Sequence, residues 1–292
     1  MIRNYAALFG AFCLAAPAAQ VNIIVQSPEQ LAQQGATISA AVADQLEAQL
    51  AQQPFDMPAR AKLLGYYYYQ WMRPGEAAAR AARRRHILWV IQNQPDSPLA
   101  GLMEAAIVPD GSSLADPEGF QQARQLWMLQ MDAKKGNPQV LGNLAQFVML
   151  TDKDLAESAL KRAVEIDPRN AQWNWSLGYL YAMGTLGVDA LGLNGQPTSV
   201  DPFARMGPFA VKARKALDAS NNPLLLAVAA SILSRYGTML APSEKAKMDY
   251  IEESIKLARK SQILEPNNPS WLNFLKQLEG WKRQLLAPGA LK

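Results

Sequence analysis

Apolar residues recur at intervals of three and four along most of the chain, and this spacing predicts helices. Ala156, Leu160 and Ala163 share one helical face, and Pro168 ends that segment. Proline has this effect because it lacks an N–H and restricts the residue before it. Alternating patterns typical of strands are scarce, with one short β-like run at residues 21–25. The pattern therefore predicts an all-α fold.

A second helix is predicted directly after this one, from Ala171 to Tyr181. Leu177, Gly178 and Tyr181 lie on one of its faces at helical spacing. Two antiparallel helices approach closely only where a side chain is small. We therefore expect tight helix contacts at Ala163 and Gly178.

These two segments together resemble the tetratricopeptide repeat (TPR) family, in which paired helices stack with a period of about 34 residues. Residues 156–168 match the second helix of one repeat, and residues 171–181 match the first helix of the next. Asn174 departs from the pattern, because the family has tryptophan there. The resemblance implies a right-handed α-solenoid of stacked antiparallel helix pairs whose concave face binds a protein or peptide.

Weaker copies of the same pattern occur elsewhere in the chain. A proline follows a similar helical segment at Pro95, Pro138 and Pro266. Leu64, Gly65 and Tyr68 repeat the Leu-Gly-x-x-Tyr spacing. The intervals between copies are irregular, so we expect about five helical pairs in residues 58–266. A generic helical bundle is the alternative.

The organisation expected from these patterns has four parts. They are a signal peptide at residues 1–19, an N-terminal segment with one helix at 20–57, the TPR-like repeats at 58–266, and a C-terminal capping helix and tail at 267–292. The predicted terminal helices cover about 37–53 and 269–286. The longest irregular segment lies at 184–208, and its glycines make no dinucleotide-binding fingerprint. We expect a surface loop there, with a ligand-contacting loop as the alternative.

The N-terminus has the features of a secretory signal peptide. Arg3 precedes an apolar run from Ala6 to Ala16, which is too short to span a bilayer. Ala16-Pro17-Ala18 supplies a cleavage signal of small residues. We therefore expect an exported protein, periplasmic or extracellular, with no transmembrane segment after cleavage. A buried N-terminal helix is the alternative.

Composition excludes several kinds of chemistry. Cys13, the only cysteine, lies in the predicted leader, so the mature chain would have no disulfide and no thiolate site. His86 is the only histidine, which rules out metal sites that need two. We expect no cofactor, no metal and no catalytic role for His86, which we interpret as a helix-surface or interface residue.

The densest basic cluster consists of Arg80, Arg83, Arg84 and Arg85. The net charge of the chain is only +4, and no broad basic face accompanies the cluster, so we expect no nucleic-acid partner. We interpret these arginines as a solvated helix face paired with acids such as Glu76. An anionic partner is the alternative.

Aromatic residues give the predicted binding site. If Leu64, Gly65 and Tyr68 are packed, the groove face implied by the TPR resemblance carries Lys62, Tyr66 and Tyr69. The same register puts Trp175 and Tyr179 on the groove face of the later repeat. Tyrosine and tryptophan are favoured in recognition surfaces because they combine a large contact area with a polar tip. Extra core packing between irregular repeats is the alternative.

The sequence therefore predicts a non-catalytic, exported TPR-like protein that binds a protein or an extended peptide on its concave face, or serves as a scaffold. The alternative is a helical enzyme or enzyme subunit that uses loop carboxylates. The acids in or near loops are Asp110, Asp116, Asp189 and Asp201. Their spacing identifies no catalytic pair. Neither the partner nor the oligomeric state follows from the sequence.

Overall fold

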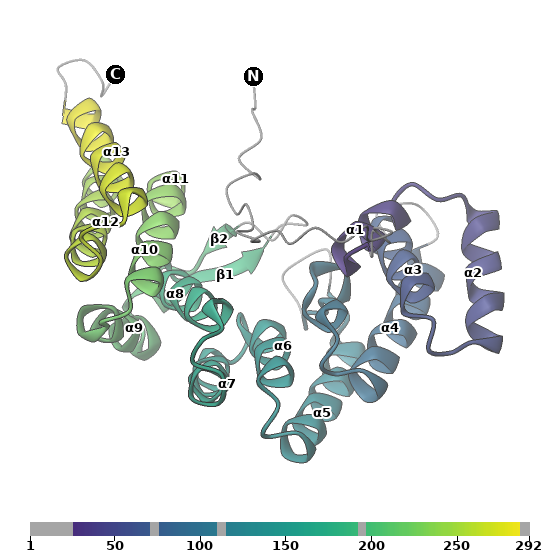
Figure 1. The fold of residues 1–292 in the computed structure, drawn as a ribbon. Coiled ribbons are helices and arrows are strands. Elements are labelled where there is room, and N and C mark those ends of the chain that lie inside the picture. Colours follow the sequence, from purple (N-terminus) through teal and green to yellow (C-terminus); the bar gives the residue numbers. More distant parts are fainter. Residues whose placement is uncertain (1–25, 71–75, 110–114, 192–196, 287–292) are drawn as a thin grey trace, which may run out of the picture.

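The computed structural model describes residues 26–70, 76–109, 115–191 and 197–286. The described chain is mostly helical, so the predicted all-α class is confirmed. The helices follow one another in a curved row, from α2 at one end to α13 at the other (Figure 1). The predicted signal peptide and the β-like run at 21–25 lie outside the described residues.

The first arm of the row has five helices and two short 3₁₀ turns. They are α1 (Pro28–Gly35), α2 (Ala40–Gln52), α3 (Met57–Gln70), α4 (Glu76–Asn93), η1 (Pro98–Gly101), η2 (Met103–Ala105) and α5 (Pro117–Ala133). The sequence patterns missed α1. Ser27 caps this helix through a reciprocal capping box with Gln30. At the other end of this arm, the Asp116 carboxylate caps α5.

The second arm continues the row from the middle of the chain. Its elements are α6 (Pro138–Val148), α7 (Lys153–Ile166), α8 (Ala171–Leu186), β1 (Val188–Leu191), β2 (Pro197–Val200), η3 (Ala204–Met206), α9 (Pro208–Ala219), α10 (Pro223–Ile232), the π-helical turn η4 (Leu233–Gly237), α11 (Thr238–Leu240), α12 (Glu244–Leu264) and α13 (Pro269–Leu286). The bounds of α13 agree with the helix expected at about 269–286.

Helix ends follow local chemistry that is visible in the sequence. Proline occupies the first turn of α1, α5, α6, α9 and α10, where its missing N–H costs no helical hydrogen bond. Asparagine and aspartate side chains cap several other helix starts, including Asp152 before α7 and Asn170 before α8. The predicted boundary at Pro168 agrees with the gap between α7 and α8.

The core forms where neighbouring helices pack on each other. α6 packs on α7, α7 on α8, α8 on both α9 and α10, α10 on α12, and α12 on α13. One large apolar cluster extends through these contacts and into the first arm. The residues predicted to face helix contacts are all buried: Ala156, Leu160, Ala163, Leu177, Gly178 and Tyr181.

The irregular segment at 184–208 differs from the expected loop. α8 continues to Leu186, and the chain then forms the antiparallel hairpin of β1 and β2. Gly187 permits this turn, because its φ of 69° lies in the left-handed region that favours glycine. The hairpin lies on the inner side of the curved row (Figure 1).

The helix that runs through α10, η4 and α11 is apolar enough for a membrane span by length and composition. It covers Pro223–Leu240, and 56% of it is buried inside the protein. A core helix passes the same test. Its buried residues include Leu226, Ala229 and Ala230, which belong to the central apolar cluster.

Candidate functional site

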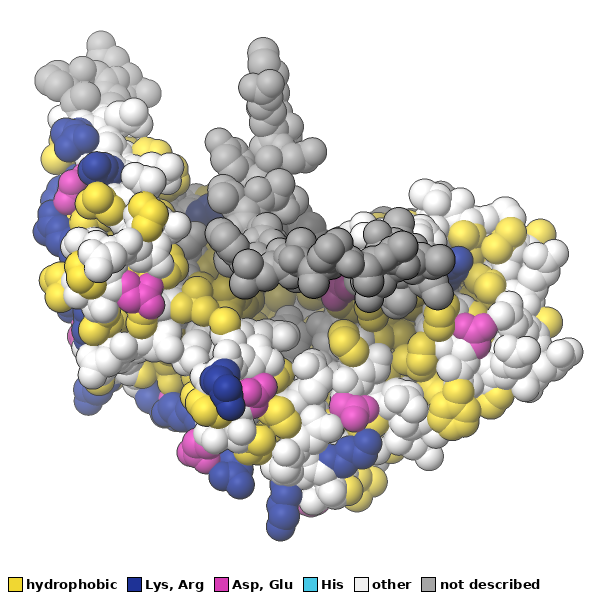
Figure 2. All heavy atoms as spheres, viewed as in Figure 1, with side chains coloured by type: hydrophobic (Ala, Val, Ile, Leu, Met, Phe, Trp, Pro, Cys, Tyr) yellow, Lys and Arg dark blue, Asp and Glu magenta, His cyan; other side chains and the backbone are white. Residues whose placement is uncertain are grey.

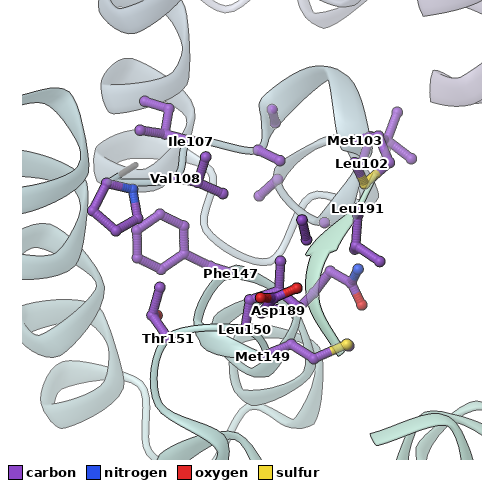
Figure 3. Close-up of a pocket in the computed structure, with 17 residues that line it drawn as sticks. Leu102, Met103, Ile107, Val108, Phe147, Met149, Leu150, Thr151, Asp189 and Leu191 are labelled. Atoms are coloured by element: carbon purple, nitrogen blue, oxygen red, sulfur yellow. The ribbon is translucent and has the colours of Figure 1, made fainter. Parts of the chain in front are cut away.

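A pocket of about 410 Å³ lies where the first arm meets the hairpin. Three parts of the chain form it: the segment at 100–109 between α4 and α5, the end of α6 with the turn after it, and β1 (Figure 3). Its lining residues are Ala100, Gly101, Leu102, Met103, Ala105, Ala106, Ile107, Val108, Pro109, Gln146, Phe147, Met149, Leu150, Thr151, Asp189, Ala190 and Leu191.

The walls of this pocket are mainly apolar. Ile107 and Val108 lie across from Phe147 and Leu150, and Leu191 closes the side towards β1 (Figure 3). Concave apolar sites with a few polar groups are typical of ligand binding, because the walls gain from leaving water and the polar groups orient the ligand. The geometry therefore suits an apolar group with a polar neighbour.

The segment at 98–109 has little regular structure, and α6 fixes its beginning. The side-chain amide of Asn143, which is buried, donates to the carbonyl oxygens of Pro95 at 2.8 Å and Ser97 at 2.9 Å. Gly101 packs against this same amide, where a side chain would collide with Asn143 Oδ1. Close backbone approach thus explains glycine at this position.

Arg83 of α4 fixes the far end of the same segment. Its guanidinium donates to the carbonyl oxygen of Glu104 at 3.0 Å and to that of Ala106. Burial lowers the pKa of Arg83 from 12.5 to about 10, so the group keeps its charge at neutral pH. The guanidinium also lies 5.3 Å from the centre of the Tyr68 ring. The hydrogen bonds of Arg83 therefore stabilise the backbone of the pocket wall.

Arg84 connects α4 to the start of α5. It bonds the Asp116 carboxylate in two places, at 2.8 and 2.5 Å, and it also pairs with Glu118. Asp116 caps α5 by accepting the N–H of Gly119. The hydrogen bonds to Asp116 raise the pKa of Arg84. The ion pair thus fixes α5 directly after the pocket-lining segment.

The interpretation of the arginine cluster as a solvated helix face is therefore wrong for Arg83, which is 5% exposed. Arg84 has the internal partners given above, and Arg85 pairs with Glu47 at 2.7 Å. The side chain of Glu76, the expected partner of Arg80, lies outside the described residues. Arg83, Arg84 and Arg85 thus have partners within the chain, and the alternative of an anionic partner stays untested.

Three polar side chains line the pocket: Gln146, Thr151 and Asp189. The Thr151 hydroxyl donates to the carbonyl oxygen of Val148 at 3.3 Å. Asp189 is exposed, and it is the one ionisable residue among the lining residues. In Figure 3 the Asp189 carboxylate lies to the lower right of the Phe147 ring, in the same lining as Leu150.

Lys153, at the start of α7, is a cation that interacts electrostatically with this acid. Its ammonium donates to the carbonyl oxygen of Leu150 at 3.3 Å. Burial lowers the pKa of Lys153, while Asp189 and Asp201 act in the opposite direction. Lys153 therefore lies behind the pocket wall and is not paired directly with Asp189.

The predicted site residues of α3 lie outside this pocket. Tyr66 packs edge-on against Tyr67, beside a small apolar cluster shared with α2. Tyr69 packs edge-on against Tyr68 in the cluster that contains Met103, Ala106 and Val108, so it supports the pocket wall. The backbone of Lys62 lies against Gly35 of α1, so α1 covers part of this face.

The predicted site residues of α8 form a separate pair. The rings of Trp175 and Tyr179 stack with centroids 5.4 Å apart, and Trp175 is 40% exposed. Burial raises the pKa of Tyr179. α4, α5, α6 and α7 separate α3 from α8 along the row (Figure 1). The five predicted residues therefore belong to two places, and a ligand role for either stays a prediction.

His86 is buried at the junction of α2, α3 and α4, and its contacts fit the interface alternative rather than a helix surface. Nδ1 lies 3.0 Å from Nη1 of Arg60, and Nε2 lies 2.9 Å from Oε1 of Glu47. Because arginine only donates, Nδ1 accepts, and Nε2 carries the proton that it donates to Glu47. Tyr67 and Arg85 donate to the same carboxylate oxygen. His86 is thus a neutral link in a structural network.

The loop acids of the enzyme alternative have different surroundings. Asp110 lies outside the described residues, and Asp116 is bonded to Arg84. Asp201 accepts the N–H of Phe203 at 2.8 Å, which leaves Asp189 as the acid of the pocket. Within the described ranges, no group of three or more histidine, cysteine, aspartate or glutamate residues could hold a metal ion.

Comparison of the chain with protein-family models, with curated proteins and with solved structures gave no significant match.

Sequence patterns missed most of the pocket. Its main wall, residues 100–109, has no helical or strand period, and it reads as a plain connection between helices. The one available signal was Asp189, which is among the loop acids of the enzyme alternative. The rest depends on contacts between residues far apart in the chain, such as Asn143 with Pro95.

Proposed function

We propose that this chain is a non-catalytic binding protein that takes an extended segment of a partner protein along the inner side of its curved row. The observation that carries the proposal is the apolar pocket, formed by the inner hairpin and the connection between α4 and α5. An apolar side chain of the partner would enter this pocket. The leader pattern at residues 1–19 supports an exported protein.

The order of helix contacts supports a TPR-like α-solenoid as the framework. From α6 onward the main helix contacts join helices one or two places apart in the chain, which is how repeat proteins build a core. In the repeat pattern, Gly178 is the small residue that allows a second helix to approach closely. In the structure, Gly178 of α8 lies against the backbone of Leu225 in α10, which agrees with this role. Stacked helix pairs of this kind leave a long inner surface for a partner.

The chain beyond β2 adds exposed apolar side chains that fit the same role. Phe203 is 81% exposed and Met206 is 73% exposed, at the two ends of one 3₁₀ turn. Residues three apart in a 3₁₀ turn share a face. Arg205 between them donates to the carbonyl oxygens of Leu186 and Leu240, which ties the turn to α8 and α11. These side chains offer a second apolar contact near the hairpin.

The lining chemistry supports binding over catalysis. The described lining of the pocket has one carboxylate, while glycoside hydrolysis by paired acids needs two. Its other polar groups are an amide and a hydroxyl, and the hydroxyl has a backbone partner. Such groups orient a ligand by hydrogen bonding.

The test is to select binders from a random linear-peptide library and to measure their affinity for pocket variants. Thr151→Trp should obstruct the pocket at an exposed position and weaken binding at least ten-fold, about 1.4 kcal/mol. Ser158→Trp, at an exposed position of α7, is the matched control and should bind like the wild type.

Thermal unfolding of both variants checks that each is folded. Selected peptides that bind the Thr151→Trp variant with unchanged affinity would contradict the proposal. Tyr69→Ala and Trp175→Ala test the two aromatic groups separately. Loss of affinity in Trp175→Ala alone would move the contact surface to α8.

A further inference from the structure

We propose that the pocket selects partner segments in which an apolar residue is accompanied by a lysine or arginine, with Asp189 as the residue that recognises the positive charge. This inference rests on the proposed function of the same pocket and names the chemistry of the segment that it takes. It depends on three observations: the position of Asp189, the state of Lys153 and the distribution of charge.

Among the described residues that line the pocket, Asp189 is the single charged side chain. Among the described residues, no lysine or arginine nitrogen lies within 4.0 Å of its carboxylate. By contrast, Asp116 and Glu157 each have a cation at hydrogen-bond distance. An acid at the edge of an apolar site is thus available for a positive group of a ligand.

Lys153 does not compete with a positive group of the ligand for Asp189. Its ammonium is bonded to the carbonyl oxygen of Leu150, on the α7 side of the pocket wall. The residue is partly buried, so its movement towards Asp189 would exchange an existing hydrogen bond for an ion pair at the surface. An exposed ion pair contributes little stability, so the exchange gains little.

Acidic residues lie in and near the described pocket wall, although the whole chain has a net positive charge. Glu104 lies on η2 within the pocket-lining segment, and Asp189 and Asp201 act together on Lys153. The cations described behind this wall, Lys153 and Arg83, are both bonded to backbone carbonyl oxygens. Lys and Arg side chains gather instead along the second arm, over α12 and α13 (Figure 2). Lys256, Arg259 and Lys282 belong to that surface.

The geometry of an extended peptide predicts the spacing between the apolar and the basic residue of the partner segment. In an extended segment, residues two apart lie on the same face, separated by about 7 Å. An apolar side chain can then enter between Ile107 and Phe147 while a basic side chain two positions away reaches Asp189. The recognised pattern is therefore apolar-x-basic.

The experiment uses two fluorescent peptides in a glycine-serine background, one with leucine-alanine-lysine and one with leucine-alanine-glutamate. Fluorescence polarisation gives the affinity of each for the full mature chain. We expect the lysine peptide to bind about five-fold or more tightly, with a preference that falls as salt is added. Asp189→Asn should remove the preference, and Asp44→Asn, at an exposed position of α2, should retain it.

The outcomes separate this inference from the proposed function. Equal affinity of the two peptides, with both blocked by Thr151→Trp, would overturn the charge preference and leave the pocket as a binding site. A lysine preference that persists in Asp189→Asn would also overturn the assignment. Binding that Thr151→Trp leaves intact, or no binding of either peptide, would contradict both.

Discussion

At the scale of single residues, Gly178 shows why an absent side chain determines a helix contact. A Cβ at this position of α8 would collide with the carbonyl oxygen of Leu225 in α10. Since the obstacle is backbone, it cannot turn aside as a side chain could. The sequence pattern predicts a close approach at Gly178, and the structure identifies α10 as the partner helix.

Replacing Gly178 by leucine should therefore reduce the free energy of unfolding by about 1–3 kcal/mol or more, because overpacking pushes α8 from α10. Urea unfolding of wild type and variant measures this. Gly136→Ala is the control, since no atom lies within 4 Å of a Cβ built there. A Gly178→Leu variant as stable as the wild type would mean that the two helices do not touch at this residue.

The network around His86 is the second residue-scale feature, and it links three helices. Burial would raise the pKa of Glu47, but hydrogen bonds from His86 and Tyr67 lower it to about 2 from 4.5. Burial lowers the pKa of His86. Arg60 keeps its charge, because its pKa falls only to about 10 by burial. The folded state therefore favours a neutral His86 and an ionised Glu47.

Both shifts predict lower stability in acid. Below the unfolded histidine pKa of 6.5, the unfolded chain binds more protons than the folded chain at His86, so the free energy of unfolding falls. Glu47 adds a second loss between pH 4.5 and about 2. Urea unfolding at several pH values measures the slope. His86→Asn should reduce the slope between about pH 7 and 5 by up to one proton.

The Glu47→Gln variant tests the carboxylate separately. The substitution should lower the free energy of unfolding by about 1–2 kcal/mol at pH 7. Below pH 4.5 the free energy of unfolding should fall less in the variant than in the wild type. Asp44→Asn on the same helix is the control, because Asp44 is exposed. A Glu47→Gln variant with the acid dependence of the wild type would contradict this role.

At the scale of elements, the segment at 98–109 shows how a connection without regular structure becomes a pocket wall. Its internal hydrogen bonds lie within two short 3₁₀ turns. In one of them, the N–H of Ala106 donates to the carbonyl oxygen of Met103. Asn143 of α6 and Arg83 of α4 add hydrogen bonds to backbone carbonyl oxygens at its start and in its middle. The conformation of this segment therefore depends on the helices that it contacts. A substitution in α4 that removes such a contact should alter the pocket.

Arg83→Leu should remove the donors for the carbonyl oxygens of Glu104 and Ala106, at a cost of about 2–4 kcal/mol. Hydrogen exchange should increase at the amides of residues 100–106, and peptide affinity should fall with it. Arg162→Leu is the control, because its ion pair with Glu165 is exposed and contributes little. Unchanged exchange in Arg83→Leu would mean that other contacts hold the wall.

Helices with strong local signals were predictable, while other elements were not. Pro168 and Asn170 mark the gap between α7 and α8, because proline and capping residues act within a few positions. The pattern missed α1, which is short and packs through Gly35 on α3. It also missed the hairpin of β1 and β2, which is stabilised by pairing across an intervening segment.

At the scale of the whole molecule, the predicted leader leads us to expect an exported protein. We expect the mature chain to begin near Ala19 or Gln20, because Ala16-Pro17-Ala18 follows an apolar run of signal-peptide length. N-terminal sequencing of protein from the native host measures this. Recovery of chains that retain Met1 in the cytosol would contradict export.

The helical class, many helix ends and the packed faces of α3 and α8 can be predicted from the sequence alone. These features depend on spacing and capping within about one helical turn, so they are readable locally. Tertiary structure decided the pocket, the burial of Arg83 and the two separate places of Tyr69 and Trp175. Each of these three features depends on contacts between residues far apart in the sequence. Local periodicity does not predict such contacts.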